Sequence, residues 1–225
     1  MGLELEVVAD DRAAARRGAE LIAAAGSSAV AERGIFELAV SGGRTPWAML
    51  AILGDLDEMP WAETELFQVD ERVAAPGSED RNLTHLVLGL SLDHQSALRP
   101  MPVTQRDLDA AAHEYESSLP DPLDLVHLGL GPDGHTASLV PGDAVLDVSG
   151  RRVAVTDGDY QGHRRMTITY PAIAAARRVL WLVTGEEKRE PLAKLLAGDD
   201  AIPAGRVAND DMVVVADEAA AGRAA

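Results

Sequence analysis

The chain has 225 residues, of which 47% are hydrophobic, so it can bury a core, and we expect a single α/β domain over residues 1–225. Its formal net charge of −17 would repel a nucleic-acid backbone, and no concentrated basic stripe offsets that charge, which argues against nucleic-acid binding. The absence of cysteine excludes disulfides, thiolate metal sites and thiol nucleophiles.

Two further features of the sequence bear on location and ligand. The amino-terminal residues lack a basic stretch followed by an apolar one, and no later segment is long enough to span a bilayer. We therefore expect a cytoplasmic protein with no membrane partner. The acidic balance also opposes anionic metabolites at long range, so a phosphate ligand would need local cations.

Short apolar runs recur along the chain with helical segments between them. This alternation predicts βαβ units and a mostly parallel sheet. Several runs lack the alternating polarity of a sheet with one wet face, so we expect helices on both faces. The runs are Glu4–Val8, Ile35–Val40, Glu65–Val69, Leu123–Leu130, Val153–Thr156, Met166–Thr169, Val179–Val183 and Met212–Val215.

The first predicted helix begins after Asp10 or Asp11, either of which can cap it, and ends at Gly26 or Gly34. The last residues, Ala219–Ala225, are consistent with a short helix or a frayed tail. In open α/β sheets, ligands bind beyond the carboxyl ends of the strands, so the loops after the strand-like runs are candidate sites. The other predicted helices are Trp47–Leu53, Asn82–Leu90, Asp107–Leu119, Pro171–Arg177 and Lys188–Leu196.

The first of these loops follows Val40 and carries paired glycines. Paired glycines let the backbone approach a ligand closely, and exposed N–H groups at a helix start attract an oxyanion. The glycine spacing matches neither a Walker loop nor a dinucleotide fingerprint. A plain structural turn is the alternative to a phosphate cradle, whose candidate residues are Ser41, Gly42, Gly43, Arg44 and Thr45.

Three charged residues, Asp70, Glu71 and Arg72, follow the run that ends at Val69. A solvated rim at a strand end would explain them without any function. As functional residues, Arg72 would fork onto a phosphate, and Asp70 would bind a sugar hydroxyl or take a proton.

The most specific motif is GLGPDGHTASL at residues 129–139. Its glycines permit a tight turn that places His135 at the mouth of the sheet. Histidine titrates near neutral pH, so His135 can accept a proton from water and later return it, assisted by Asp70 or Asp133. No second histidine or carboxylate sits at a familiar ligand spacing, so no metal site is expected.

Two more cations follow or precede strand-like runs. Lys188 begins a predicted helix after a glycine, where it would deliver a point charge to a phosphate or pair with a nearby glutamate. Arg165 precedes Met166–Thr169, where it adds positive potential at the entrance or forms a basic sheet edge that discourages pairing. No role is assigned to the remaining histidines, His85, His94, His113, His127 and His163.

In this order and at these separations, the four loops resemble the 6-phosphogluconolactonase family of the glucosamine-6-phosphate isomerase/6-phosphogluconolactonase superfamily, over nearly the whole chain. The resemblance implies a Rossmann-like fold shared with glucosamine-6-phosphate deaminase and ribose-5-phosphate isomerase. It implies hydrolysis of 6-phospho-D-glucono-1,5-lactone to 6-phospho-D-gluconate, the second step of the oxidative pentose phosphate pathway. Supporting segments are Asp80–Asn82, Met166–Thr169 before Pro171, and Ile202-Pro203.

The resemblance also implies site residues. It places the base on His135, the loop acid on Asp70, and the phosphate-binding region on Gly42–Thr45, Arg72 and Lys188. It implies no organic cofactor and no essential metal. We expect a phosphorylated sugar lactone as the small-molecule partner, and a monomer or weak homodimer.

Two other functions are considered. A glucosamine-6-phosphate deaminase or isomerase has similar loop text, but in the deaminase a glutamate lies five residues beyond the loop histidine, where this chain has Val140. A sugar-phosphate sensor would bind without turnover, because one fold hosts many functions. Such sensors usually carry an output module, and no helix-turn-helix segment is evident here.

Overall fold

The structure is a computed structural model that describes residues 2–222. One seven-stranded sheet runs through the molecule in the order β1-β10-β9-β6-β2-β3-β5, and every neighbouring pair is parallel. This confirms the predicted parallel sheet. Its strands are β1 (Gly2–Val8), β2 (Phe36–Val40), β3 (Thr64–Gln68), β5 (Leu98–Arg99), β6 (Leu125–Gly129), β9 (Val179–Val183) and β10 (Asp211–Asp217).

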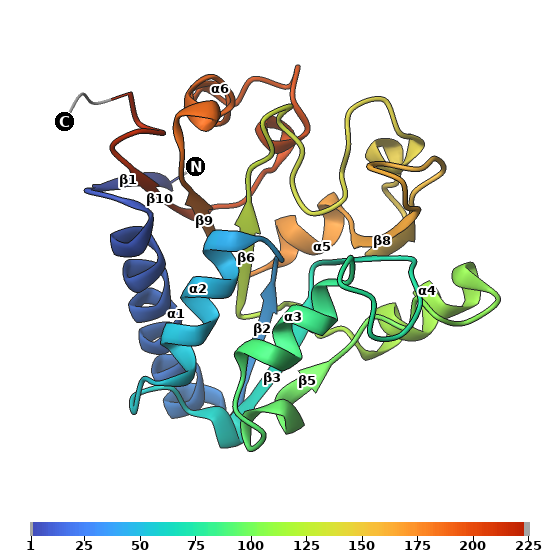
Figure 1. Cartoon of the computed structure of the whole chain (residues 1–225), viewed down its shortest axis with the longest axis horizontal. Helices are drawn as coiled ribbons and strands as arrows, with labels where there is room; N and C mark the ends of the chain where they lie inside the picture. The colour runs from blue at the N-terminus through green and yellow to red at the C-terminus, as the bar shows by residue number, and fades with distance from the viewer. Residues whose placement is uncertain (1, 223–225) are drawn as a thin grey trace.

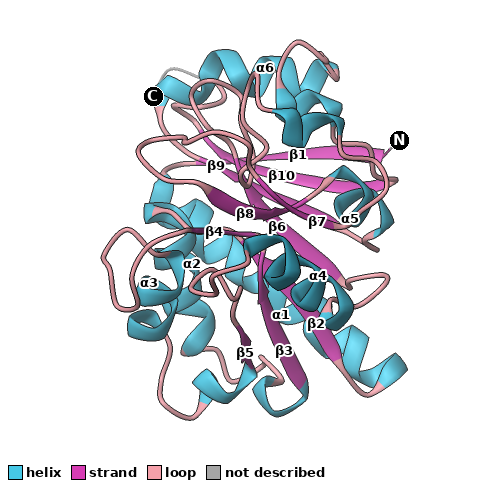
Figure 2. Ribbon diagram, turned by 90° about the vertical axis from the view of Figure 1, so that its right-hand side faces the viewer, coloured by secondary structure: helices cyan, strands magenta, loops and turns pink. Residues whose placement is uncertain are grey.

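Helices cover both faces of this sheet, as predicted from the several strand runs that lack alternating polarity. Successive residues of one strand enter different cores: Val179 and Trp181 pack on one side, and Leu180 and Leu182 on the other. Figure 1 shows α2 and α3 in front of the sheet with α1 beside α2, and Figure 2 shows α5 on the side opposite to α2 and α3. The buried clusters place α1 in one core with α2, and α4 in the other core with α5. The helices are α1 (Asp11–Arg33), α2 (Arg44–Gly54), α3 (Asn82–Gly89), α4 (Leu108–Ser118), α5 (Tyr170–Ala175) and α6 (Arg189–Ala197).

Helix α1 shows how the sequence sets its own ends. The carboxylate of Asp10 accepts a hydrogen bond from the Ala13 N–H at 2.7 Å and so caps the helix start. Gly34 ends the helix at a left-handed φ of 79°, whereas Gly26 lies inside it, where a side chain would meet the Phe36 ring at 3.0 Å. Of the two predicted ends, Gly34 is therefore the correct one.

A second, antiparallel sheet was not predicted. It has the order β4-β8-β7, built from β4 (Asp70–Arg72), β7 (Val153–Val155) and β8 (Arg165–Ile168). Two runs expected in the main sheet therefore form a separate one, and the charged stretch expected as a loop is a strand, which pairs Arg72 with Arg165. The sequence pattern marks a strand but does not name its partner.

Arg165 lies on the central strand of this small sheet, so the interpretation of Arg165 as a basic sheet edge is wrong. The sheet adjoins the main one through Val69, whose N–H donates to Val40 O and whose carbonyl accepts from Ile168 N–H. The end of β3 thus passes directly into β4. This junction carries the charged stretch to the carboxyl edge of the main sheet.

The remaining elements are short. Lys188 ends a 3-10 turn rather than opening α6, and residues 219–222 form a turn, while residues 223–225 lie outside the described part. Within residues 2–222, the helices are too short or too polar to cross a bilayer. The 3-10 turns are η1 (Trp61–Glu63), η2 (His94–Ala97), η3 (Ala144–Asp147), η4 (Glu186–Lys188) and η5 (Pro203–Arg206).

Candidate active site

All four predicted loops meet at one cavity of about 210 Å³, which we call the His135 cavity. It lies at the carboxyl ends of the main-sheet strands, as expected for an open parallel sheet. The proposed chemistry requires His135 to face the same hollow as Arg72 and Lys188, and it does. The lining residues are Ser41, Gly42, Gly43, Asp70, Arg72, Asn82, Gly129, Leu130, Gly131, Pro132, His135, Ala137, Arg165 and Lys188.

Two predicted cradle residues lie just outside the His135 cavity. Arg44 and Thr45 line an adjoining cavity of about 180 Å³, which shares Gly42, Gly43 and Lys188 with the first. The Thr45 and Thr184 hydroxyls are hydrogen-bonded at 2.7 Å and join the start of α2 to the loop after β9. The cradle loop therefore borders both cavities.

The local geometry requires glycine at both positions of the Gly42-Gly43 pair. A side chain at Gly42 would place its Cβ 2.0 Å from the side-chain amide oxygen Oδ1 of Asn82, and Gly43 has a φ of 129°, which favours glycine. Behind the loop, Ser41 N–H donates to the carbonyl of His127 at 3.2 Å. Complete burial lowers the pKa of His127 to about 3, so this histidine is neutral and structural.

His135 is held by Asp133. Asp133 Oδ1 lies 2.5 Å from His135 Nδ1 and also accepts from the His135 backbone N–H at 3.2 Å. The hydrogen bond to His135 lowers the pKa of Asp133, which is therefore a carboxylate that accepts from a protonated Nδ1. Among the described residues no hydrogen bond reaches Nε2, so its lone pair is free in a side chain that lines the cavity.

The turn around His135 depends on Gly131. Gly131 N–H donates to His135 O at 2.8 Å, and Gly134 N–H donates to Gly131 O at 3.0 Å. A Cβ on Gly131 would lie 2.0 Å from His135 Nδ1. The imidazole therefore packs directly over this glycine, and any side chain there would displace it.

Three cations line the His135 cavity with little to neutralise them. Lys188 is partly buried, which lowers its pKa, and the nearest carboxylate oxygen, on Glu187, is 4.0 Å away. Arg72 donates to the carbonyl of Asp80 at 2.8 Å and forms no ion pair within the described residues. Arg165 is buried, with Asp70 Oδ2 at 3.9 Å. Their charges are available to an anionic ligand.

Asp70 is not part of a solvated rim. It is 5% exposed, and Glu71 is fully buried, so that interpretation of the charged stretch is wrong. Asp70 Oδ2 accepts from the Ser138 hydroxyl at 2.6 Å, and Oδ1 accepts from the Asn82 amide at 3.2 Å. Both oxygens of this carboxylate are therefore engaged by protein groups.

Three residues of the site, Asn82, Ser138 and Tyr160, were given no role from the sequence. Asn82 and Ser138 lie within or beside recognised motifs and touch Asp70, so a search for buried partners of that acid would have found them. Tyr160 donates a hydrogen bond to Asp133 Oδ2 at 2.8 Å from the connection between β7 and β8. Nothing local in the sequence marks it.

Comparisons with known proteins agree with this geometry. The family model for glucosamine-6-phosphate isomerases and 6-phosphogluconolactonases matches residues 9–215. A curated 6-phosphogluconolactonase from Mycobacterium tuberculosis is 34% identical, with 99% of each chain covered. Another, from Synechocystis, is 35% identical over 76% of this chain and 75% of the relative.

Solved structures of other proteins share the fold of this chain. A 6-phosphogluconolactonase from Shewanella baltica has a TM-score of 0.86 at 25% identity, with 96% of this chain and 98% of that chain covered. A monomeric glucosamine-6-phosphate deaminase has a TM-score of 0.80 at 19% identity, over 97% and 99% of the two chains, and so shares the fold. The chain belongs to the 6-phosphogluconolactonase family, within the superfamily of glucosamine-6-phosphate isomerases and 6-phosphogluconolactonases.

Proposed function

We propose that this chain hydrolyses 6-phospho-D-glucono-1,5-lactone to 6-phospho-D-gluconate, and that residues 1–225 act as one domain. The supporting observation is that His135, with Nε2 free, lines the same cavity as Arg72, Arg165 and Lys188. A general base and a cluster of cations in one cavity suit a substrate that combines a neutral lactone ester with an anionic phosphate group. The family membership of the chain supports the same reaction.

The phosphate is held where Lys188 and the glycine loop meet. Lys188, Gly42 and Gly43 border both adjoining cavities, so an anion there faces the lysine and the backbone at the start of α2. Arg72 reaches the cavity from the end of β4 and supplies the planar guanidinium that binds phosphate oxygens. Anchoring the phosphate fixes the lactone ring relative to His135, so the reacting groups no longer have to find each other by diffusion.

His135 then acts as base and acid in turn. Nε2 removes a proton from a water molecule, whose oxygen attacks the lactone carbonyl carbon to form a tetrahedral oxyanion. The protonated imidazole, stabilised by Asp133, returns that proton to the ring oxygen as the carbon–oxygen bond breaks, and the product is a carboxylic acid that ionises. Catalysis of this kind contributes typically about 10²–10⁴-fold.

Asp70 and Arg165 take supporting parts in this proposal. Because both oxygens of Asp70 already accept hydrogen bonds, its contacts favour holding Asn82 and Arg165 in place over removing a proton. Arg165 adds positive potential at the cavity, which favours the tetrahedral oxyanion over the neutral carbonyl. No step in the proposed reaction needs a metal or an organic cofactor.

The deaminase alternative needs a carboxylate that this chain does not offer at the corresponding position. Val140 is apolar and 4% exposed, and it does not line the His135 cavity. We propose a monomer or weak homodimer. We also propose a cytoplasmic location, where a phosphorylated sugar is retained because charged groups cross bilayers poorly.

A lactonase assay coupled to oxidation of 6-phosphogluconate, corrected for spontaneous hydrolysis, tests the function. The wild type should hydrolyse the lactone and leave glucosamine 6-phosphate unchanged. His135→Ala should lose at least about 100-fold in kcat, whereas His113→Ala, an exposed histidine on α4, should keep full activity. Tight binding of 6-phosphogluconate by an inactive wild type would instead indicate a sensor.

A further inference from the structure

Asp133, the acid that holds the proposed base His135, accepts a second side-chain hydrogen bond. The two carboxylate oxygens of Asp133 accept from different groups: Oδ1 from His135, and Oδ2 from the Tyr160 hydroxyl at 2.8 Å. A carboxylate held at only one oxygen can rotate away from its partner, whereas one held at both cannot. Burial, followed by the bond to Asp133, raises the pKa of Tyr160 to about 12, so the hydroxyl keeps its proton and remains a donor.

The tyrosine ring makes two more contacts within the same site. It packs edge-on against the His135 imidazole, with centroids 5.2 Å apart and an interplanar angle of 65°. The guanidinium carbon of Arg165 lies 5.0 Å from the ring centroid, and Arg165 Nη2 donates to the Tyr160 carbonyl at 3.1 Å. One residue thus contacts the proposed base, its acid and a cavity-lining cation.

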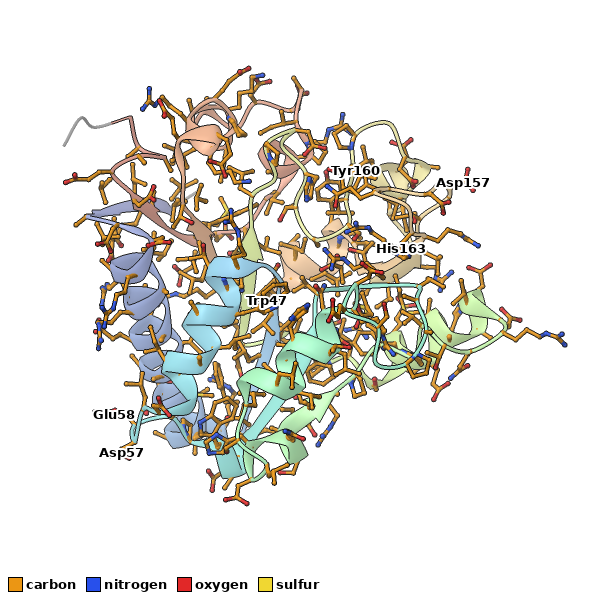
Figure 3. All side chains as sticks on the ribbon, in the orientation of Figure 1. Trp47, Asp57, Glu58, Asp157, Tyr160 and His163 are labelled. Carbon is orange, nitrogen blue, oxygen red and sulfur yellow. The ribbon has the colours of Figure 1, made fainter. Side chains whose placement is uncertain are left out.

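A tight turn holds Tyr160 in this position. Tyr160 and His163 exchange backbone hydrogen bonds across Gln161 and Gly162, whose φ values of 53° and 84° are both positive, as a type I′ hairpin turn requires. Figure 3 labels Tyr160 and His163 close together on this connection, far from Asp57 and Glu58 at the other end of the molecule. His163 Nε2 also lies 3.4 Å from Asp80.

We propose that Tyr160 is a positioning residue for the lactonase reaction: its hydroxyl fixes the Asp133 carboxylate, which in turn fixes the tautomer and direction of His135. This inference rests on the proposed function. Tyr160 does not line the His135 cavity, so it acts through its neighbours and not on the substrate. The order of hydrogen bonds is Tyr160 hydroxyl to Asp133, and His135 Nδ1 to Asp133, which leaves Nε2 to face the substrate.

Tyr160→Phe separates the hydroxyl from the ring. The variant keeps the packing of the ring on His135 and Arg165 and removes the hydroxyl, which donates to Asp133 Oδ2 at 2.8 Å and lies 3.2 Å from His135 Nδ1. We expect kcat to fall by about 10-fold, by analogy with the lower end of the loss when a metal-bound histidine loses its outer hydrogen-bond partner, with KM unchanged. The matched control is Tyr170→Phe, which removes a 2.8 Å hydrogen bond to Pro203 O outside the site and should keep both constants.

A double-mutant cycle distinguishes positioning from a general structural effect. If Tyr160 acts through Asp133, Tyr160→Phe should cost about 10-fold in the wild type and nothing further in an Asp133→Asn background. An equal loss in both backgrounds, a rise in KM at constant kcat, or kinetics matching those of Tyr170→Phe would overturn the proposal. Thermal unfolding of both tyrosine variants verifies that each is folded.

The same assay separates the two proposals. A wild type without activity above spontaneous hydrolysis would refute the lactonase function itself. An active wild type with an inactive His135→Ala and a fully active Tyr160→Phe would leave the function standing and remove only the role of Tyr160.

Discussion

Gly131→Ala gives the sharpest test of the geometry around His135. Gly131 is not among the residues with a left-handed φ, so the backbone tolerates alanine there, and the conflict is with the side chains beside it, chiefly the imidazole. The new Cβ would lie 2.0 Å from Nδ1 and 2.2 Å from Cε1, so the ring must withdraw by about 1.4 Å to reach the 3.4 Å of ordinary contact. A misplacement of 1 Å can cost about 100-fold in rate, and we expect at least that loss in kcat.

The coupled lactonase assay measures this loss, and the control is Gly150→Ala. Gly150 is exposed, has open space where the methyl group of alanine would lie, with no atom within 4 Å, and is outside the His135 cavity, so its variant should behave as wild type. Thermal unfolding of both variants separates a moved ring from a damaged fold. A folded Gly131→Ala with wild-type kcat would show that the proton transfer does not depend on the position of His135.

Two further predictions concern Lys188, a cation of the site, and His127, a buried histidine behind the glycine loop. Lys188→Gln should raise KM and lower kcat/KM by about 10- to 150-fold, because a hydrogen bond to a charged group contributes about 1.5–3 kcal/mol; an unchanged KM in steady-state kinetics would place the phosphate elsewhere. For His127, whose pKa is lowered from 6.5 to about 3 by burial, the unfolded chain takes up a proton that the native chain refuses. Stability should therefore fall as the pH drops below 6.5, by up to about 1.4 kcal/mol per pH unit, and urea unfolding of His127→Gln should show a shallower fall.

Much of the main sheet was predictable because burial on both faces leaves a direct trace in the sequence. The runs at Ile35–Val40 and Val179–Val183 are apolar at nearly every position, and the structure places them in the interior of the parallel sheet. The two-residue strand β5 has no such trace, since Leu98 and Arg99 are too few to form a pattern.

The small sheet and the tyrosine were harder to predict for one shared reason: both depend on pairings between distant segments. β4 is a strand because β8, almost 100 residues later, pairs with it, and Asp70, Glu71 and Arg72 alone suggest a solvated loop. Tyr160 meets Asp133 only through the turn before β8. The Gly131–His135 loop, by contrast, is a local turn, so its motif could be recognised from the sequence alone.

The pairing of Arg72 with Arg165 affects the stability of the protein without a bound ligand. Directly opposed residues on antiparallel strands project to one face, and like charges in such a pair oppose each other. Burial is the main cause that lowers the pKa of Arg165, and the charge of Arg72 adds to it. An anion seated between them turns this opposition into attraction, and a ligand that binds only the native state shifts the equilibrium away from unfolding. A bound anionic ligand would thus stabilise the native state by an amount that grows with the ligand concentration.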